Sequence, residues 1–140
     1  MTGRQTGAVL GHLGLNVPDL AAAKVYYGEL FPLLGYEPFL NAEDEFAYRP
    51  AAGKRGTYLF FYAAEQAGEY SHAQSGLQHL AFMRPTRTAV EAVHRHVVQG
   101  GNEVLHSPQE FAQYGSPYFA TFWLDPFGFM LEAVCHYDRD

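Results

Sequence analysis

The feature that most constrains the fold of this chain is an internal repeat. The stretches "GHLGLNV" and "GLQHLAF" each place a histidine beside a short apolar run, and each run soon reaches a proline. His12 and His79 are 67 residues apart (79 − 12), and Pro18 and Pro85 have the same offset (85 − 18). A fixed offset of this kind indicates two copies of one supersecondary unit.

A helical pattern follows each proline and carries its own start and stop signals. In the first copy Asp19 is the expected N-cap and Gly35 lies just beyond the end. In the second copy Thr88 and Glu91 stand at capping-box spacing, and the pair 100–101 is Gly-Gly. These signals predict one helix in each half.

Each half then continues to a further apolar run, at residues 57–64 and 129–136. The order strand, helix, then two or three strands is therefore shared. We expect a single domain over residues 1–140, with module one at about 7–66 and module two at about 75–137. The modules should pack together, because a unit of about 65 residues buries little surface alone.

Composition narrows the classes of partner and site. The 140 residues are 48% hydrophobic and 16% aromatic, with a formal net charge of −6 and no basic run. A nucleic-acid or membrane partner is not expected. The single cysteine, Cys135, excludes an intramolecular disulfide and a Cys-rich zinc site. Without an export signal or an apolar span in the sequence, we expect a cytoplasmic protein.

Strand periodicity predicts which side chains avoid the helix. Alternate residues of a strand share a face, so the apolar face of the first strand, with Leu15 and Val17, should cover the helix and leave His12 opposite. His79 is placed in the same way, and Glu132 interrupts the apolar run "FMLEAV". A carboxylate in such a run is rarely buried unless it is paired or bound to a cation.

Two imidazoles and one carboxylate form a metal-binding triad with open coordination positions. We therefore predict one divalent metal, Fe, Mn, Ni, Co or Zn, bound by His12, His79 and Glu132. Each residue alone has a plain alternative, a hydrogen-bonded core histidine or an edge glutamate. A buried hydrogen-bond network without metal is the remaining structural interpretation.

The sequence resembles the vicinal oxygen chelate superfamily, which includes glyoxalase I, extradiol dioxygenases and the fosfomycin- and bleomycin-resistance proteins. The resemblance covers nearly the whole chain and is carried by "GHLGLNVPDLAAAKVYY", "LQHLAF" and "DPFGFMLEAV". It implies an α+β fold in which two paired βαβββ modules form an eight-stranded cup-shaped sheet around a metal site. It also implies that His12, His79 and Glu132 occupy the ligand positions.

The sequence departs from the family pattern at the fourth ligand position of the metal site. Aligning Gly56 with Gly128 places Phe60 opposite Glu132, where glyoxalase I has a glutamate. Three ligands resemble the dioxygenases, yet Phe122 stands where their signature has a tyrosine. Lyase, isomerase and dioxygenase chemistry therefore all stay open.

Further site residues follow from parity and from a turn-rich segment. Parity places the candidate pocket residues Tyr58, Phe60, Tyr62, Tyr118 and Phe122 on the concave face. Residues 106–117 are expected to form a loop at the rim, with Glu110, Tyr114 and His106 as candidate acids or bases.

The predicted function is a divalent-metal enzyme of the glyoxalase/dioxygenase type, acting on a small substrate chelated through its oxygens. The alternative is a drug- or metabolite-binding resistance protein of the same fold without catalysis. We expect a homodimer, since edge strands and aromatic surface would otherwise stay uncovered. Whether the cup forms within one chain or by module exchange between two chains stays open.

Overall fold

Module one consists of a strand, a helix and three further strands. The computed structural model describes residues 8–138, so the expected start of this module at residue 7 lies outside the described residues. Its elements are β1 (His12–Val17), α1 (Leu20–Leu30), the 3-10 helix η1 (Phe31–Leu34), β2 (Tyr36–Asn41), β3 (Glu45–Pro50) and β4 (Tyr58–Ala63).

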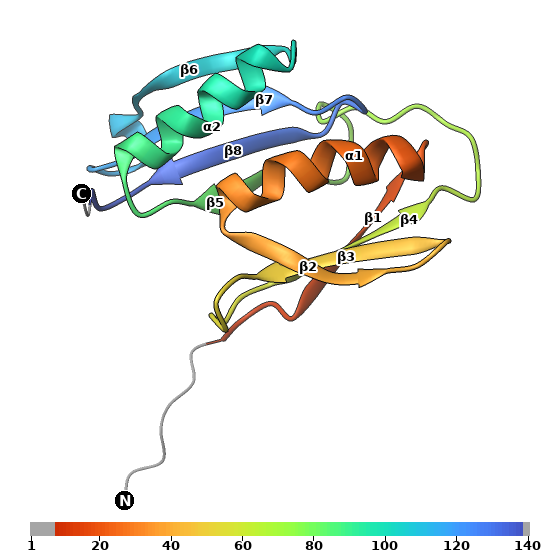
Figure 1. Cartoon of the computed structure of the whole chain (residues 1–140). Coiled ribbons are helices and arrows are strands. Elements are labelled where there is room, and N and C mark those ends of the chain that lie inside the picture. The colour runs from red at the N-terminus through yellow and green to blue at the C-terminus, as the bar shows by residue number, and fades with distance from the viewer. Residues whose placement is uncertain (1–7, 139–140) are drawn as a thin grey trace, which may run out of the picture.

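Module two repeats this order. Its elements are β5 (Leu80–Met83), α2 (Arg87–Gln99), β6 (Val104–Glu110), the 3-10 helix η2 (Ala112–Tyr114), β7 (Phe119–Leu124) and β8 (Met130–Cys135). The predicted α+β fold with two paired βαβββ modules is confirmed, and Figure 1 shows the two modules packed against each other.

Both sheets have the same topology, which places the first and last strand of each module side by side. Sheet one has the order β1-β4-β3-β2 and sheet two the order β5-β8-β7-β6. The first strand pairs in parallel with the last strand of its module, and the other pairings are antiparallel. β1 and β5 are therefore edge strands, and the eight strands form two four-stranded sheets within one chain.

The helix boundaries follow local chemistry, with one correction. The carboxylate of Asp19 accepts a hydrogen bond from the Ala22 N–H at 3.0 Å, as the N-cap prediction requires. In module two the cap is Thr86, whose hydroxyl accepts from the Ala89 N–H at 2.9 Å, so the prediction of Thr88 as cap was wrong. Thr86 stands before the first helical residue, where a side-chain oxygen meets an unpaired backbone donor.

The C-terminus of α1 is extended by η1, where Pro32 lies in the first turn. Gly35 then ends the 3-10 helix with φ +79°. Glycine is suited to this position because a left-handed backbone costs it little.

One apolar core joins both helices to both sheets. It contains Val17 and Phe61 from sheet one, Phe82 and Leu131 from sheet two, and Val93 from α2. Strand parity therefore predicted the helix-facing side of each sheet correctly. Neither α1 nor α2 has the length and apolar character needed to span a membrane.

Polar contacts fix how α1 docks on module two. The hydroxyl of Tyr27 donates to Asp125 Oδ2 at 2.5 Å, and the Trp123 indole N–H donates to the Tyr26 hydroxyl at 3.0 Å. Asp125 also accepts the backbone N–H groups of Phe127 and Phe129 at 2.8 Å each. Because these groups are buried and paired, they hold the modules in one relative orientation.

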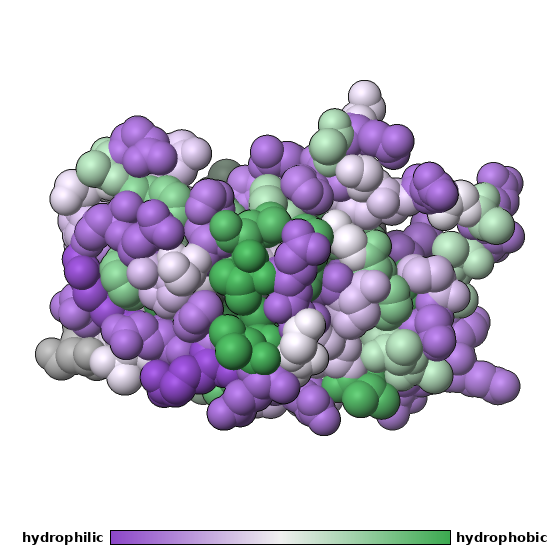
Figure 2. All heavy atoms as spheres, turned by 90° about the horizontal axis from the view of Figure 1, so that it is seen from above, coloured by the Kyte–Doolittle hydropathy of each residue, from purple (hydrophilic) through white to green (hydrophobic). Residues whose placement is uncertain are grey.

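The docking through helices leaves the other face of each sheet on the outside of the pair. Seen from above, the molecule is mostly hydrophilic, with hydrophobic side chains gathered in a band near the middle (Figure 2). Exposed hydrophobic side chains also occur on the strands, with Phe39 47% and Met83 66% exposed.

Candidate metal centre

His79 and Glu132 meet on the outward face of sheet two. Glu132 lies on β8 and is fully buried, and His79 directly precedes β5. Nε2 of His79 lies 3.2 Å from Oε1 of Glu132. The contact lacks hydrogen-bond geometry, and Oε1 accepts no hydrogen bond from any described residue. A buried carboxylate oxygen left in this way is costly unless a cation approaches it.

Gln78 determines which nitrogen of His79 faces the carboxylate. The amide oxygen of Gln78 lies 2.5 Å from Nδ1 of His79. Because an amide oxygen only accepts, Nδ1 carries the proton in this bond. When the ring is neutral, this bond leaves the lone pair of Nε2 directed toward Glu132 Oε1, so that two acceptors face each other. Metal-binding histidines are held in this way by a second hydrogen bond.

The spacing of these two acceptors fits a shared metal ion. Nitrogen and oxygen ligands bind zinc-like ions at about 2.0–2.2 Å, so two ligands of one ion lie roughly 3.0–3.5 Å apart. The measured separation of 3.2 Å falls within this range. The pair can therefore supply two of the three predicted ligands.

Tyr118 holds the second oxygen of the carboxylate. Its hydroxyl donates to Oε2 of Glu132 at 2.6 Å. Burial, followed by the hydrogen bond and charge of Glu132, raises the pKa of Tyr118 above its ordinary value. The phenol stays protonated as a donor and leaves Oε1 as the free oxygen of Glu132.

His12 lies on the other sheet. It is exposed at the start of β1, and its ring meets the Phe60 ring edge to face at 5.4 Å between centroids. Across the stretch 8–138, no three His, Cys, Asp or Glu side chains are grouped so that they could hold a metal ion. One chain thus brings together His79 and Glu132 but not His12.

The registers show that Phe60 and Glu132 are equivalent positions. Gly14 pairs with Phe60 in sheet one, and Ala81 pairs with Glu132 in sheet two. Gly14 and Ala81 are themselves separated by the repeat offset of 67 (81 − 14). Module one therefore carries a phenyl ring where module two carries the buried carboxylate.

The predicted pocket residues divide between the two outward faces. On sheet one the Phe39 ring packs against the rings of Tyr58 and Phe60. The Phe60 ring stacks on that of Tyr62, with 6.4 Å between the ring centroids. On sheet two the Phe122 ring lies 6.0 Å from that of His79. Both sets therefore lie on the faces turned away from the helices, but on separate sheets of the chain, and their sharing one pocket stays a prediction.

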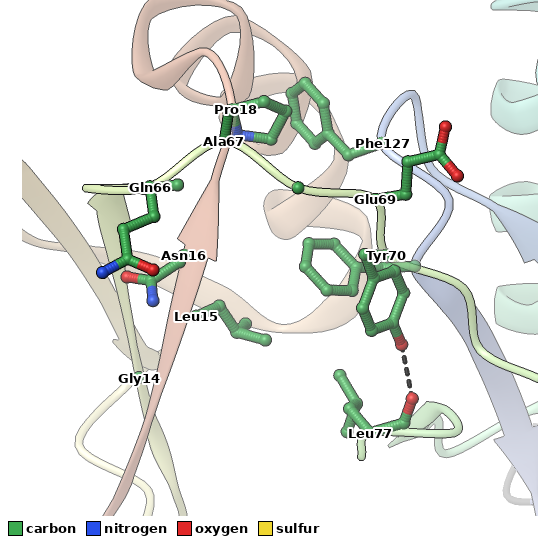
Figure 3. A pocket seen from close by; sticks show the side chains of 13 residues that line it. Gly14, Leu15, Asn16, Pro18, Gln66, Ala67, Glu69, Tyr70, Leu77 and Phe127 are labelled. Carbon is green, nitrogen blue, oxygen red and sulfur yellow. Dashed lines mark hydrogen bonds between the residues drawn. The ribbon is translucent and has the colours of Figure 1, made fainter. Parts of the chain in front are cut away.

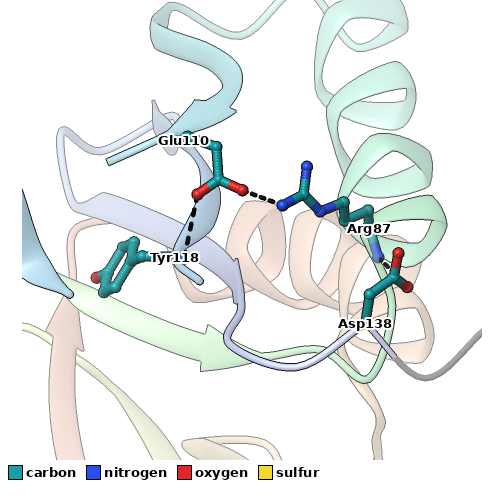
Figure 4. Close-up of polar contacts among 4 residues, drawn as sticks. All are labelled: Arg87, Glu110, Tyr118 and Asp138. Carbon is teal, nitrogen blue, oxygen red and sulfur yellow. Dashed lines mark hydrogen bonds and ion pairs between the residues drawn. The ribbon is translucent and has the colours of Figure 1, made fainter. Parts of the chain in front are cut away.

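Of the polar candidates at the rim, Glu110 is held by an ion pair. Its carboxylate contacts the Arg87 guanidinium and accepts a hydrogen bond from the Tyr118 backbone N–H at 3.3 Å (Figure 4). The backbone N–H of Arg87 donates to the Asp138 carboxylate. Tyr114 is 62% exposed. His106 lies nearer the pair, with its ring 5.5 Å from that of Phe122.

Part of the expected rim loop is strand. Residues 106–110 belong to β6, and the pairing of β6 with β7 shifts register twice, between Val104 and His106 and between His106 and Gln109. The prediction of a loop over all of 106–117 was therefore wrong for its first five residues. β6 is an edge strand with irregular pairing, a setting that tolerates Pro108.

A cavity of about 640 Å³ lies at the free edge of β1, away from these side chains. Figure 3 shows Asn16 and Gln66 side by side near one wall, while the Tyr70 hydroxyl donates to the Leu77 carbonyl. His12, His79 and Glu132 do not line it.

The sequence interpretation missed Gln78 and the Tyr27–Asp125 pair. Adjacency to His79 was the available signal for Gln78, and Asp125 stands in the turn "DPFG" before β8. Nothing in the sequence indicates that the Tyr27 hydroxyl reaches that turn, 98 residues away.

Comparison with known proteins identifies the family. The model of the glyoxalase/bleomycin resistance protein/dioxygenase superfamily matches residues 9–133. The uncharacterized protein YqjT of Bacillus subtilis (strain 168) is 26% identical over 126 residues, which are 88% of this chain and 95% of YqjT.

Solved structures agree. A candidate glyoxalase from Bacillus halodurans has a TM-score of 0.79 and 27% identity, covering 92% of this chain and 96% of its own. Lactoylglutathione lyase from Agrobacterium tumefaciens has a TM-score of 0.64 and 16% identity, covering 94% and 96%, and so is similar in fold. This chain belongs to the glyoxalase/bleomycin resistance protein/dioxygenase superfamily.

Proposed function

We propose that this protein is a divalent-metal enzyme whose site forms between two copies of the chain. His79 and Glu132 of one copy and His12 of the other would hold the ion. The observation that carries the proposal is the fully buried Glu132, whose Oε1 accepts no hydrogen bond from the described residues and lies 3.2 Å from Nε2 of His79. A cation at this point satisfies both acceptors.

The arrangement of the modules supports the use of a second copy. Helix packing holds the outward faces of the two sheets apart within one chain, while β1 and β5 keep free edges. The outward face of sheet one exposes His12 together with Phe39 and Tyr62. Covering these apolar side chains with sheet two of another copy would bury them and complete the triad.

A metal held here supplies Lewis-acid stabilisation of an anion developing on a substrate chelated through two oxygens. The protein side chains do the remaining work. Tyr118 and Gln78 fix the orientations of Glu132 and His79. Tyr58, Phe60 and Tyr62 would bind a planar or apolar substrate body. Glu110 forms an ion pair with Arg87, which favours a structural role for Glu110.

Elemental mass spectrometry on purified protein tests the proposal. Wild type should contain metal in stoichiometric amount, and Glu132→Ala should contain almost none. Glu110→Ala is the matched control, because it removes a carboxylate outside the metal centre and should keep the metal. Absence of metal from wild type, even after incubation with Fe, Mn, Ni, Co and Zn, would contradict the proposal.

The metal found would direct the search for substrates. Iron favours catechols and a measurement of oxygen uptake, whereas nickel, zinc, cobalt or manganese favours proton-transfer and addition substrates.

The aromatic face of sheet one favours a second candidate, a protein that binds a drug or metabolite without catalysis. A His12→Ala/His79→Ala double variant separates the two functions. Ligand affinity unchanged by the double substitution would support sequestration, and loss of both metal and turnover would support the enzyme.

A further inference from the structure

A second cavity, of about 530 Å³, lies at the junction of the modules on the side of β5. Module one contributes the end of η1 and the turn between β3 and β4, and module two contributes residues 81–85 and 136–137. His12, His79 and Glu132 do not line this cavity either. Its volume is within the range of cavities that hold small molecules.

Positive charge is concentrated around this cavity in an otherwise acidic protein. Lys54, Arg55 and Arg84 line it, and its lining contains no Asp or Glu. These are three of nine Lys and Arg residues in a chain of net charge −6. Within residues 8–138, none of the three forms an ion pair.

Arg84 is the central group. Among the described residues, its buried Nε has no hydrogen-bond partner, and its Nη1 donates to the Met83 carbonyl at 3.3 Å. The guanidinium lies so close to Gly35 that a Cβ there would come within 2.7 Å of Nη1. A partly buried guanidinium is costly to leave without an anion, and its planar donors match carboxylate and phosphate oxygens.

The turn that carries the other two cations is held in a defined shape. The Lys54 N–H donates to the Ala51 carbonyl at 3.2 Å, and Ala52 and Gly53 between them have φ of 60° and 68°. A left-handed alanine is strained and persists when its surroundings fix it.

Contacts to the rest of module one fix the first residues of this turn. The Ala51 N–H donates to the Gly35 carbonyl at 2.9 Å, and the Ala52 N–H donates to Glu37, whose carboxylate is already paired with Arg49. Lys54 and Arg55 are thereby presented at the cavity on an ordered turn.

We infer that this cavity binds a small organic molecule with at least two negative charges, through Arg84, Lys54 and Arg55. A phosphate ester and a polycarboxylate share this chemistry. The apolar walls, which include Phe82 and Met83, would accommodate the body of the molecule. This site is separate from the proposed metal centre and does not depend on it.

Calorimetric titration with inorganic pyrophosphate and with citrate tests the inference. Glu132→Gln protein is used as well as wild type, because both anions also chelate metals. Binding should persist in Glu132→Gln, which distinguishes this site from the metal centre. Tighter binding of pyrophosphate than of citrate would indicate that the natural ligand is a phosphate ester. Tighter binding of citrate would indicate a polycarboxylate.

The variants locate the site. In the Glu132→Gln background, Arg84→Gln should weaken binding by about tenfold to a hundredfold, the usual effect of losing a charged hydrogen bond. Because Lys54 and Arg55 are exposed, Lys54→Gln and Arg55→Gln should each weaken anion binding by up to about fivefold. Arg95→Gln, on the exposed surface of α2, is the charge-matched control and should bind as before.

Changes in the NMR chemical shifts of backbone amides on addition of anion give an independent readout. They are measured without the Arg84→Gln variant and so do not require it to fold. Saturating anion should shift the amides of Gly35, Gly53 and Gly56 and leave Gly28 in place. No binding to Glu132→Gln protein, equal weakening by Arg95→Gln, or shifts that avoid these three glycines would each overturn the inference.

Discussion

Module one and module two use the same strand order and register for different chemistry. Ala81 pairs with Glu132 in sheet two, while its counterpart Gly14 pairs with Phe60 in sheet one. Gln78, which orients His79, corresponds to Gly11 at the same offset of 67 (78 − 11). The repeated backbone therefore supplies equivalent positions, while the side chains at those positions decide which module can hold a metal.

Because of this difference, the two modules contribute different groups to the proposed site. Module two has an oriented imidazole, a buried carboxylate and a phenol that fixes it. Module one has an exposed imidazole among aromatic rings. We expect substitutions around Glu132 and His79 to change metal affinity strongly. In module one only His12 should act on the metal, and substitutions of the aromatic residues beside it should act mainly through substrate.

The largest effect is expected for Glu132→Gln, which keeps the size of the side chain but removes its charge. Metal affinity should fall by more than about a hundredfold, beyond the effect usual for residues outside the ligand shell. Competition with a chromogenic chelator measures it. Phe60→Leu at the equivalent position should retain the metal, and equal losses in the two variants would remove the distinction between the modules.

Gln78→Ala should have the next largest effect. Without its acceptor the His79 ring can rotate and change tautomer, so metal affinity should fall by about tenfold to a hundredfold. The same chelator competition applies. Gly11→Ala is the matched control, since a Cβ there meets no atom within 4 Å and should leave affinity unchanged. An unaltered affinity in Gln78→Ala would contradict the role given to Gln78.

Phe60→Glu should reduce the difference between the modules. It places a carboxylate beside His12 at the position equivalent to Glu132, where the side chain is only half-buried. A fourth ligand should raise metal affinity by about tenfold or more, at least the effect of an outer-shell partner. Lower affinity with an intact fold would show that Phe60 does not face the metal.

The smallest effect concerns the contact that docks the modules. Tyr27→Phe leaves the buried Asp125 with one donor fewer and should lower the free energy of unfolding by about 1–3 kcal/mol. Denaturant unfolding measures this loss. Tyr36→Phe removes a hydrogen bond within module one, to the Thr57 carbonyl, and should cost about 1 kcal/mol or less.

The loss in Tyr27→Phe should depend on pH. Burial raises the pKa of Asp125 above its ordinary value of 3.8. Stability from this carboxyl is present below the ordinary pKa and is lost as pH rises through the raised value in the folded protein. The charged form then relies most on Tyr27, so the variant should lose more stability at pH 8 than at pH 4. Equal losses at both pH values would contradict this coupling.

Much of the fold could be predicted from the sequence because its signals are local. The offset of 67, the cap at Asp19 and strand parity correctly placed β1, both helices and the faces of His79 and Glu132. β6 was harder to recognise, because Ser, Pro and Gln in an irregular edge strand resemble a loop.

The way the modules dock had no such signal. It depends on pairs far apart in the chain, such as Tyr27 with Asp125 and Tyr26 with Trp123. Their side chains leave no periodic pattern in the sequence. For this reason the separation of His12 from His79 and Glu132 became evident only in the structure.

The most direct test of the shared metal centre is the metal content of a mixed dimer. His12→Ala and Glu132→Ala chains with different affinity tags are co-expressed, and the species carrying both tags is purified. If the site is shared, the mixed dimer has two metal centres. One lacks both His12 and Glu132, and the other keeps all three ligands. We predict that each variant alone holds no metal and that the mixed dimer holds one ion. A mixed dimer without metal, or the absence of any dimer, would contradict a site formed between two copies.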